Sequence, residues 1–114
     1  MNPIYDVVIL GCGEAGIFAA YELASHRPEL KVLALDQGRD IYHRSCPIVA
    51  GKVKECIHCP VCDTMCGFGG AGAFSDGKLS LSPDVGGNLP EILGYDKATE
   101  LIRESDDIYL KFGA

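Results

Sequence analysis

The feature that most constrains this chain is a glycine-rich turn between a short apolar segment and a helical pattern. Residues 11–16 fit the spacing G-x-G-x-x-G. The preceding residues 4–10 are mostly β-branched or apolar and predict a buried strand, and apolar residues then recur at helical spacing from Glu14 to about His26. Residues 31–35 predict a second strand. Strand, turn, helix and strand in this order predict a βαβ unit over residues 1–37.

Each residue of this turn has a physical role if the turn binds a dinucleotide. Gly11 permits the tight turn, Gly13 lets a diphosphate approach the backbone, and Gly16 lets the helix pack closely on the strand. The start of the helix offers free N–H groups to phosphate, and Asp36, which follows the second strand, would accept hydrogen bonds from ribose hydroxyls. No basic residue directly follows Asp36, which argues against NADP here. The alternative is a glycine-rich turn of another βαβ protein with a merely solvated Asp36.

The rest of the chain shows less regular patterning. Residues 38–94 are rich in cysteine and glycine and predict mainly loop, although the alternation over 78–82 favours a short strand. Residues 95–114 predict a helix that stops near Gly113. Two parallel strands leave the faces and edges of a sheet open. We therefore expect an α/β, Rossmann-like fold that is incomplete, in which residues 1–114 form a single partial domain.

Charge and hydropathy exclude several function classes. The net charge is −6, and no stretch concentrates Lys and Arg, so we expect no nucleic-acid partner and no binding to an anionic membrane surface. The apolar run over 7–10 has no basic residue before it and does not resemble a signal peptide. We therefore expect a cytoplasmic protein. Cysteines stay reduced there unless they bind metal or perform redox chemistry.

Four of the six cysteines form one run. Cys56, Cys59, Cys62 and Cys66 have the spacing C-x2-C-x2-C-x3-C, which is that of bacterial iron–sulfur ferredoxins. In those proteins the fourth cysteine of the run serves another cluster, so Cys46, which precedes Pro47, is a candidate remote ligand in place of Cys66. The spacing also suits tetrahedral zinc, a redox-active thiol pair or simply packed thiols.

A second glycine-rich segment covers residues 67–79. Its glycines leave N–H groups unhindered, which can form an anion-binding nest, while Ser75 can hydrogen-bond and Lys78 can neutralise a phosphate or the flavin N1 region. The alternative is a flexible linker, but Phe68 and Phe74 among the glycines favour packing.

These motifs together resemble those of the uncharacterised FAD-dependent dehydrogenases, flavoproteins related to the glutathione-reductase-type FAD fold. The resemblance rests on residues 11–16, 44–47, the cysteine run and, most specifically, residues 69–79. It implies a longer protein whose later parts complete the FAD sheet and supply a domain for a substrate or NAD(P)H.

The resemblance implies a flavin-dependent oxidoreductase that passes hydride or electrons through FAD to or from a small-molecule redox substrate, with the remainder of its own chain as partner. The alternative is a non-enzymatic nucleotide-binding fragment that is stabilised by a bound zinc ion or cluster. No catalytic residue is assigned. The candidate cofactor-binding residues are Gly11, Gly13, Glu14, Ala15, Gly16, Asp36, Gln37, Gly70, Ala71, Gly72, Ser75 and Lys78.

Overall fold

The computed structural model describes residues 4–75 and 77–114. The chain divides at Ser75 into two compact units, a larger one before this residue and a smaller helical one after it. No helix in the described part of the chain is long and apolar enough to cross a membrane.

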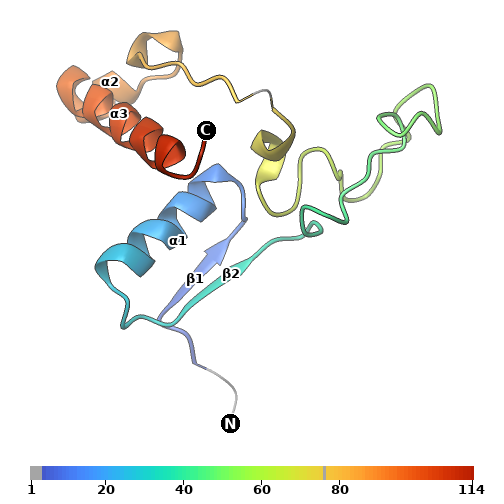
Figure 1. The fold of residues 1–114 in the computed structure, drawn as a ribbon, viewed down its shortest axis with the longest axis horizontal. Coiled ribbons are helices and arrows are strands. Elements are labelled where there is room, and N and C mark those ends of the chain that lie inside the picture. The colour runs from blue at the N-terminus through green and yellow to red at the C-terminus, as the bar shows by residue number, and fades with distance from the viewer. Residues whose placement is uncertain (1–3, 76) are drawn as a thin grey trace. The chain divides into compact units, whose positions relative to one another are not determined.

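The first unit contains the βαβ arrangement (Figure 1). Strand β1 spans Val7–Leu10, helix α1 spans Glu14–His26 and strand β2 spans Val32–Leu35. The two strands pair in parallel, with Val7 opposite Val32 and Leu10 opposite Leu35. The predicted α/β fold class, with its amino-terminal βαβ unit, is therefore confirmed, although both strands are shorter than the segments that predicted them.

Glycine at position 16 lets α1 lie close to β1. A Cβ atom at Gly16 would overlap the carbonyl oxygen of Gly11 and contact Ile9. At the far end, the N–H of Arg27 donates to the carbonyl of Leu23 (2.8 Å), and the helix stops just before Pro28. The turn and the helix end are thus fixed by the residues that the sequence pattern singled out.

Apolar burial in the structure is small. Among the described residues, the buried apolar side chains are the small ones of Cys12, Pro83 and Ala98, whereas Leu10 at the end of β1 is 81% exposed. A two-stranded sheet covered by one helix leaves most of its apolar surface open. Polar contacts must therefore supply much of the stability of the loops in the first unit.

The segment predicted as loop contains more regular structure than expected. Gly70–Phe74 and Pro83–Val85 form short 3-10 helices, and Leu89–Leu93 forms helix α2. Pro90 lies in the first turn of α2, where its missing N–H costs no hydrogen bond, so it is compatible with the start of this helix. These short elements interrupt a segment that is otherwise loop, as predicted.

The short strand favoured over residues 78–82 is wrong. These residues lie in the described part of the chain and have no strand conformation. Alternating polarity suits a strand only when a neighbouring strand accepts its hydrogen bonds. The sheet of the described chain contains only β1 and β2.

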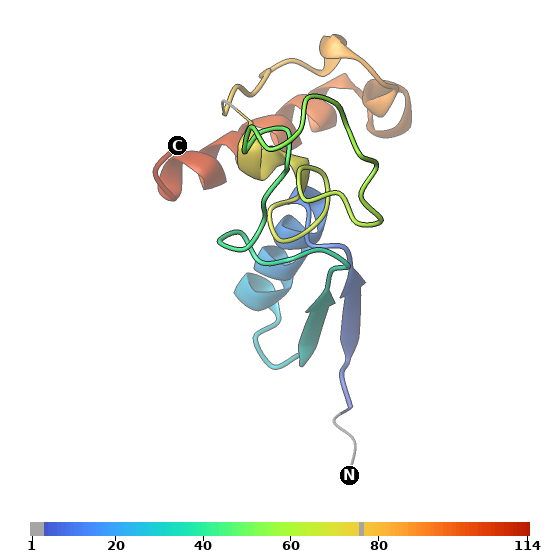
Figure 2. The same ribbon diagram turned by 90° about the vertical axis from the view of Figure 1, so that its right-hand side faces the viewer.

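The second unit is helical. Helix α3 spans Tyr95–Lys111, close to the predicted helix, and ends before Gly113, whose φ is +100°. Figure 2 shows α2 and α3 as consecutive helices in orange and red, and the two pack against each other.

Replacing Gly16 with alanine tests the close approach of α1 and β1. Helix propensity alone predicts that Gly16→Ala stabilises the protein by about 1 kcal/mol. Because the new Cβ would overlap the Gly11 carbonyl, we expect instead a loss of about 1–3 kcal/mol in the free energy of unfolding. Urea unfolding of the full natural chain measures this difference. Ala19→Gly on the same helix is the propensity control, and a more stable Gly16→Ala protein would contradict the packing.

Candidate functional site: a cavity at the carboxyl ends of the strands

A cavity of about 580 Å³ lies where β1 and β2 end. The carboxyl ends of parallel strands are where open α/β folds bind their ligands. The cavity is therefore in the place that the sequence pattern predicts for a nucleotide. Its lining residues are Leu10, Gly11, Gly13, Leu35, Asp36, Gln37, Met65, Cys66 and Gly70.

The two glycine-rich segments meet at this cavity. A Cβ at Gly70 would lie 2.9 Å from the Cα of Gly13, so only glycine permits this approach of the two backbones. The N–H of Gly69 also donates to the carbonyl of Cys12 (2.8 Å). Residues more than fifty positions apart in the sequence thus form one wall. Residues 67–72 of the second glycine segment are therefore packed against the rest of the first unit, as a flexible linker would not be.

Glu14 extends this contact along α1. Its carboxylate occupies the space where a Cβ of Gly72 would be, but a glutamate side chain can move, so Gly72 is less constrained than Gly70. Neither Glu14 nor Gly72 lines the cavity. Four other predicted residues of this unit also lie outside the lining, namely Ala15, Gly16, Ala71 and Ser75. Lys78 belongs to the second unit.

Asp36 is the centre of the hydrogen bonding in this region. Its Oδ2 accepts the N–H of Cys12 (2.7 Å), and its Oδ1 accepts the N–H groups of Gly38 and Gly67 (2.8 Å each). One carboxylate therefore joins the end of β2 to the fingerprint turn and to the second glycine segment. The ribose contact predicted for Asp36 stays a prediction, and the two oxygens already accept three amides.

These amides also shift the protonation of Asp36. The hydrogen bonds from Cys12 and Gly38 lower the pKa of the Asp36 carboxyl, partial burial opposes them, and the Gly67 amide and the charge of Arg44 lower it further. The pKa in the folded state therefore lies below that of an ordinary aspartate. The stability that Asp36 contributes is present above the ordinary value and is lost as the pH falls through the folded value.

Arg44 is a buried residue that the sequence reasoning did not place. Its guanidinium donates to the carbonyls of Asp63 (2.7 Å), Thr64 (3.0 Å) and Phe68 (3.0 Å), and it lies 4.6 Å from the centre of the Phe74 ring. A planar guanidinium can satisfy several carbonyls at once, which a lysine ammonium cannot do in the same geometry. Arg44 belongs to the motif at residues 44–47, but its role could not be predicted, because only the long-range fold brings these carbonyls together.

The cysteines separate into two groups. Cys46, Cys56, Cys59 and Cys62 line a small cavity of about 40 Å³, together with Asp63 and apolar residues. Cys66 lines the larger cavity instead, and its sulfur accepts the Gln37 side-chain amide at 3.2 Å. All six cysteines, which lie in the described part of the chain, are free thiols. No group of three ligands in that part is already arranged for a single metal ion.

Hydrogen bonds reach two of the sulfurs in the small cavity. The amides of Val49 and Ile48 and the hydroxyl of Thr64 lower the pKa of the Cys46 thiol, while partial burial and Asp63 oppose them. The N–H of His58 approaches the sulfur of Cys56 at 3.4 Å, and His58 itself has a φ of +50°. The hydrogen bonds at Cys46 therefore favour its thiolate form.

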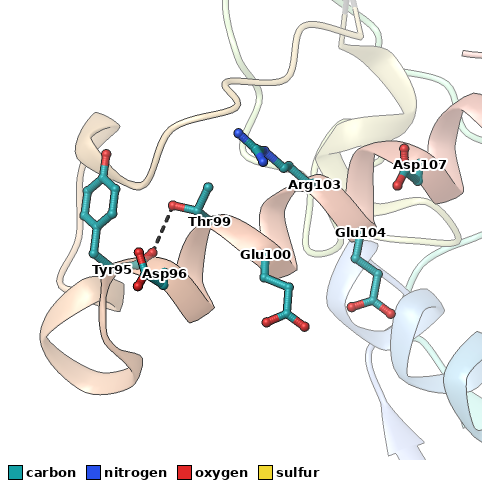
Figure 3. A pocket seen from close by; sticks show the side chains of 7 residues that line it. All are labelled: Tyr95, Asp96, Thr99, Glu100, Arg103, Glu104 and Asp107. Atoms are coloured by element: carbon teal, nitrogen blue, oxygen red, sulfur yellow. Dashed lines mark hydrogen bonds between the residues drawn. The ribbon is translucent and has the colours of Figure 1, made fainter.

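A further hollow lies on the helical unit (Figure 3). It has a volume of about 660 Å³ and is formed by side chains of α3 alone. Its lining includes Arg103 and an excess of carboxylates, which would repel a phosphate. The dashed line in Figure 3 is the bond from the Thr99 hydroxyl to the Tyr95 carbonyl, at 2.9 Å, which stays within the helix. This hollow lies along a single helix, so it is a shallow depression between neighbouring side chains and not a candidate ligand site.

Comparison with known proteins finds short similarities only. The chain is 51% identical over 37 residues to a thiamine thiazole synthase of Coprinopsis cinerea, which is 32% of this chain and 12% of that enzyme. It is 54% identical over 33 residues to a thiamine thiazole synthase of Phaeosphaeria nodorum, 29% of this chain and 10% of that enzyme. The chain therefore spans about a tenth of the length of these curated relatives. Neither a protein-family model nor a solved structure matches the chain.

Replacing Asp36 with asparagine tests its role. An amide has one acceptor oxygen and cannot accept three N–H groups as the carboxylate does, so we expect Asp36→Asn to lower the free energy of unfolding by about 1–3 kcal/mol near neutral pH. The difference from the parent should shrink as the pH falls through the folded pKa of Asp36, because the parent then loses its charge. Urea unfolding at a series of pH values measures the loss in the free energy of unfolding and its dependence on pH. Asp107→Asn on exposed α3 is the control, and a difference independent of pH would contradict the assignment.

Proposed function

We propose that this chain forms part of the FAD-binding site of a flavin-dependent oxidoreductase, in which the cavity at the ends of β1 and β2 receives the ADP half of the cofactor. The observation that carries the proposal is the meeting of Gly13 and Gly70 beside this cavity. Two unhindered backbones at the carboxyl edge of a parallel sheet are what a diphosphate needs in order to approach main-chain amides closely.

The start of α1 supports a diphosphate site. Gly13 is the N-cap of α1 and supplies no side-chain cap, so the amides of the first turn are left for a ligand. A Cβ at Gly11 would meet no atom within 4 Å, and one at Gly13 would meet only the Cα of Gly70, at 3.9 Å. The space next to both glycines is therefore open. The helix dipole adds partial positive charge at this end.

Asp36 and Gln37 complete the proposed site. Both line the cavity, and a carboxylate has about four acceptor positions, of which the amides of Cys12, Gly38 and Gly67 use three. One position is left for a ribose hydroxyl. In this proposal the three amides fix the orientation of the Asp36 carboxylate whether or not a ligand is bound. The remaining acceptor position then contacts the sugar.

FAD, when bound, supplies hydride and single-electron transfer, and NAD(P)H or another small molecule would be the second substrate. The described residues bind and orient the cofactor, and none of them is assigned a catalytic role. The similarity to two thiamine thiazole synthases supports an enzyme, but it covers about a tenth of each of them. Their reaction is therefore not carried over to this chain.

Gly13→Ala tests this proposal without disturbing the fold. Gly13 has a φ of −73° and a ψ of −174°, which alanine adopts readily, and the added Cβ has room in the ligand-free chain. We expect the full natural protein to be yellow and to bind FAD. The variant should bind FAD about tenfold more weakly or worse, while its free energy of unfolding stays within about 0.5 kcal/mol of the parent's.

Titration with FAD, followed by flavin fluorescence, and urea unfolding provide the two measurements. Ser25→Ala, at the far end of α1, is the control and should leave the affinity for FAD and the free energy of unfolding unchanged. The proposal fails if the parent takes up no FAD on reconstitution, or if Gly13→Ala binds FAD as tightly as the parent. Binding of ADP without flavin would favour the non-enzymatic nucleotide-binding alternative.

A further inference from the structure

The small cysteine-lined cavity is separate from the proposed nucleotide site. Its cysteines are Cys46, Cys56, Cys59 and Cys62, whereas Cys66 lines the other cavity. The sequence left Cys46 and Cys66 as equal candidates for a fourth ligand. The structure distinguishes them, because only Cys46 shares a cavity with the first three cysteines of the run.

The environment of these sulfurs suits metal-bound thiolates. The Cys46 sulfur accepts hydrogen bonds from the Val49 and Ile48 amides and the Thr64 hydroxyl, and the His58 amide approaches the sulfur of Cys56. Amide donors to cysteine sulfur stabilise the negative charge that a thiolate ligand carries. The left-handed φ of His58 turns the chain between Cys56 and Cys59 so that both residues line the cavity.

We propose that Cys46, Cys56, Cys59 and Cys62 ligate a 4Fe–4S cluster, and that Cys66 is not a ligand. The spacing C-x2-C-x2-C with a remote cysteine before proline is the ligand pattern of such clusters. Here the remote pair is Cys46-Pro47, and the fourth cysteine of the run is followed by Gly67.

The cysteine pattern favours a cluster over a single zinc ion. Structural zinc sites usually take their cysteines as C-x2–4-C pairs, whereas three cysteines spaced C-x2-C-x2-C with a remote Cys-Pro are typical of a 4Fe–4S cluster. The four cysteines of this pattern line one cavity of about 40 Å³. Pro47, Ile48 and Val53 also line it and would limit the access of water to a cluster.

Cluster binding requires no change in the oxidation state of the cysteines. The S–H bond of each of the four cysteines that line the cavity breaks, an Fe–S bond forms in its place, and one proton per thiol is released to solvent. Ferrous and ferric iron in equal amounts, together with inorganic sulfide, all supplied from solution, form the cluster without any net oxidation or reduction. Failure of this proposal can be distinguished from failure of the flavin proposal, since iron and flavin are measured separately.

Metal analysis of the full natural protein, purified without oxygen and reconstituted with iron and sulfide, tests the cluster. We expect a brown protein with about four iron and four acid-labile sulfide per chain. Cys46→Ser, Cys56→Ser, Cys59→Ser and Cys62→Ser should each lower both contents about tenfold or more. Cys66→Ser, the matched control within the same run, should keep them.

Alkylation of the unmutated protein gives a second test that does not depend on whether a variant folds. In the metal-free chain, the exposed Cys56, Cys59 and Cys62 should react with iodoacetamide faster than the buried Cys12. After reconstitution, these three and Cys46 should be protected, as peptide mass spectrometry would record, while Cys66 remains reactive.

Several results would overturn the proposal. Zinc without sulfide, or no metal at all after reconstitution, would exclude a cluster. Equal labelling of Cys56, Cys59 and Cys62 before and after reconstitution would exclude them as ligands. Loss of iron in Cys66→Ser together with its retention in Cys46→Ser would show that the ligand assignment is wrong.

Discussion

The order of the first unit depends on one carboxylate. Asp36 accepts hydrogen bonds from the amides of Cys12, Gly38 and Gly67 and so connects a strand end, the glycine-rich turn at residues 11–16 and a distant loop. This matters because the described chain buries few apolar residues and cannot hold its loops by hydrophobic contact. An ionised acceptor compensates, because hydrogen bonds to charged groups are stronger than those between neutral groups.

Arg44 stabilises the same region by donating hydrogen bonds, whereas Asp36 accepts them. Where Asp36 collects N–H groups, Arg44 collects the carbonyls of Asp63, Thr64 and Phe68. Residues 63–68, at the end of the cysteine run and just after it, therefore have three carbonyls and one amide held by two opposite charges. The glycines make this possible, because a Cβ at Gly67 would overlap the carbonyl oxygen of Arg39 and one at Gly38 would overlap the backbone of Gly67. The two charged side chains and the glycines together determine the course of the backbone beside the cavity at the ends of β1 and β2.

The sequence predicted those parts of the structure that are determined locally. The bounds of α1, the parallel pairing of β1 with β2 and the place of Asp36 at a strand end follow from periodicity and one spacing rule. The three amides on Asp36 and the carbonyls around Arg44 could not be predicted, because backbone groups carry no residue-specific signal and are brought together only by the folded chain. The error over residues 78–82 has the same origin, since a strand requires a partner that alternation alone does not specify.

The turn at residues 62–66 connects the two proposed sites. The amides of Met65 and Cys66 donate to the carbonyl of Cys62, so a ligand of the small cavity and a lining residue of the large one belong to one hydrogen-bonded turn. Arg44 holds the carbonyls of the intervening Asp63 and Thr64. A cluster bound through Cys62 would restrict this turn, and a nucleotide packed against Cys66 would restrict it from the other side. Since each ligand would lower the ordering cost for the other, the two proposals imply that cluster and flavin bind with positive coupling, which linkage requires to be equal in both directions.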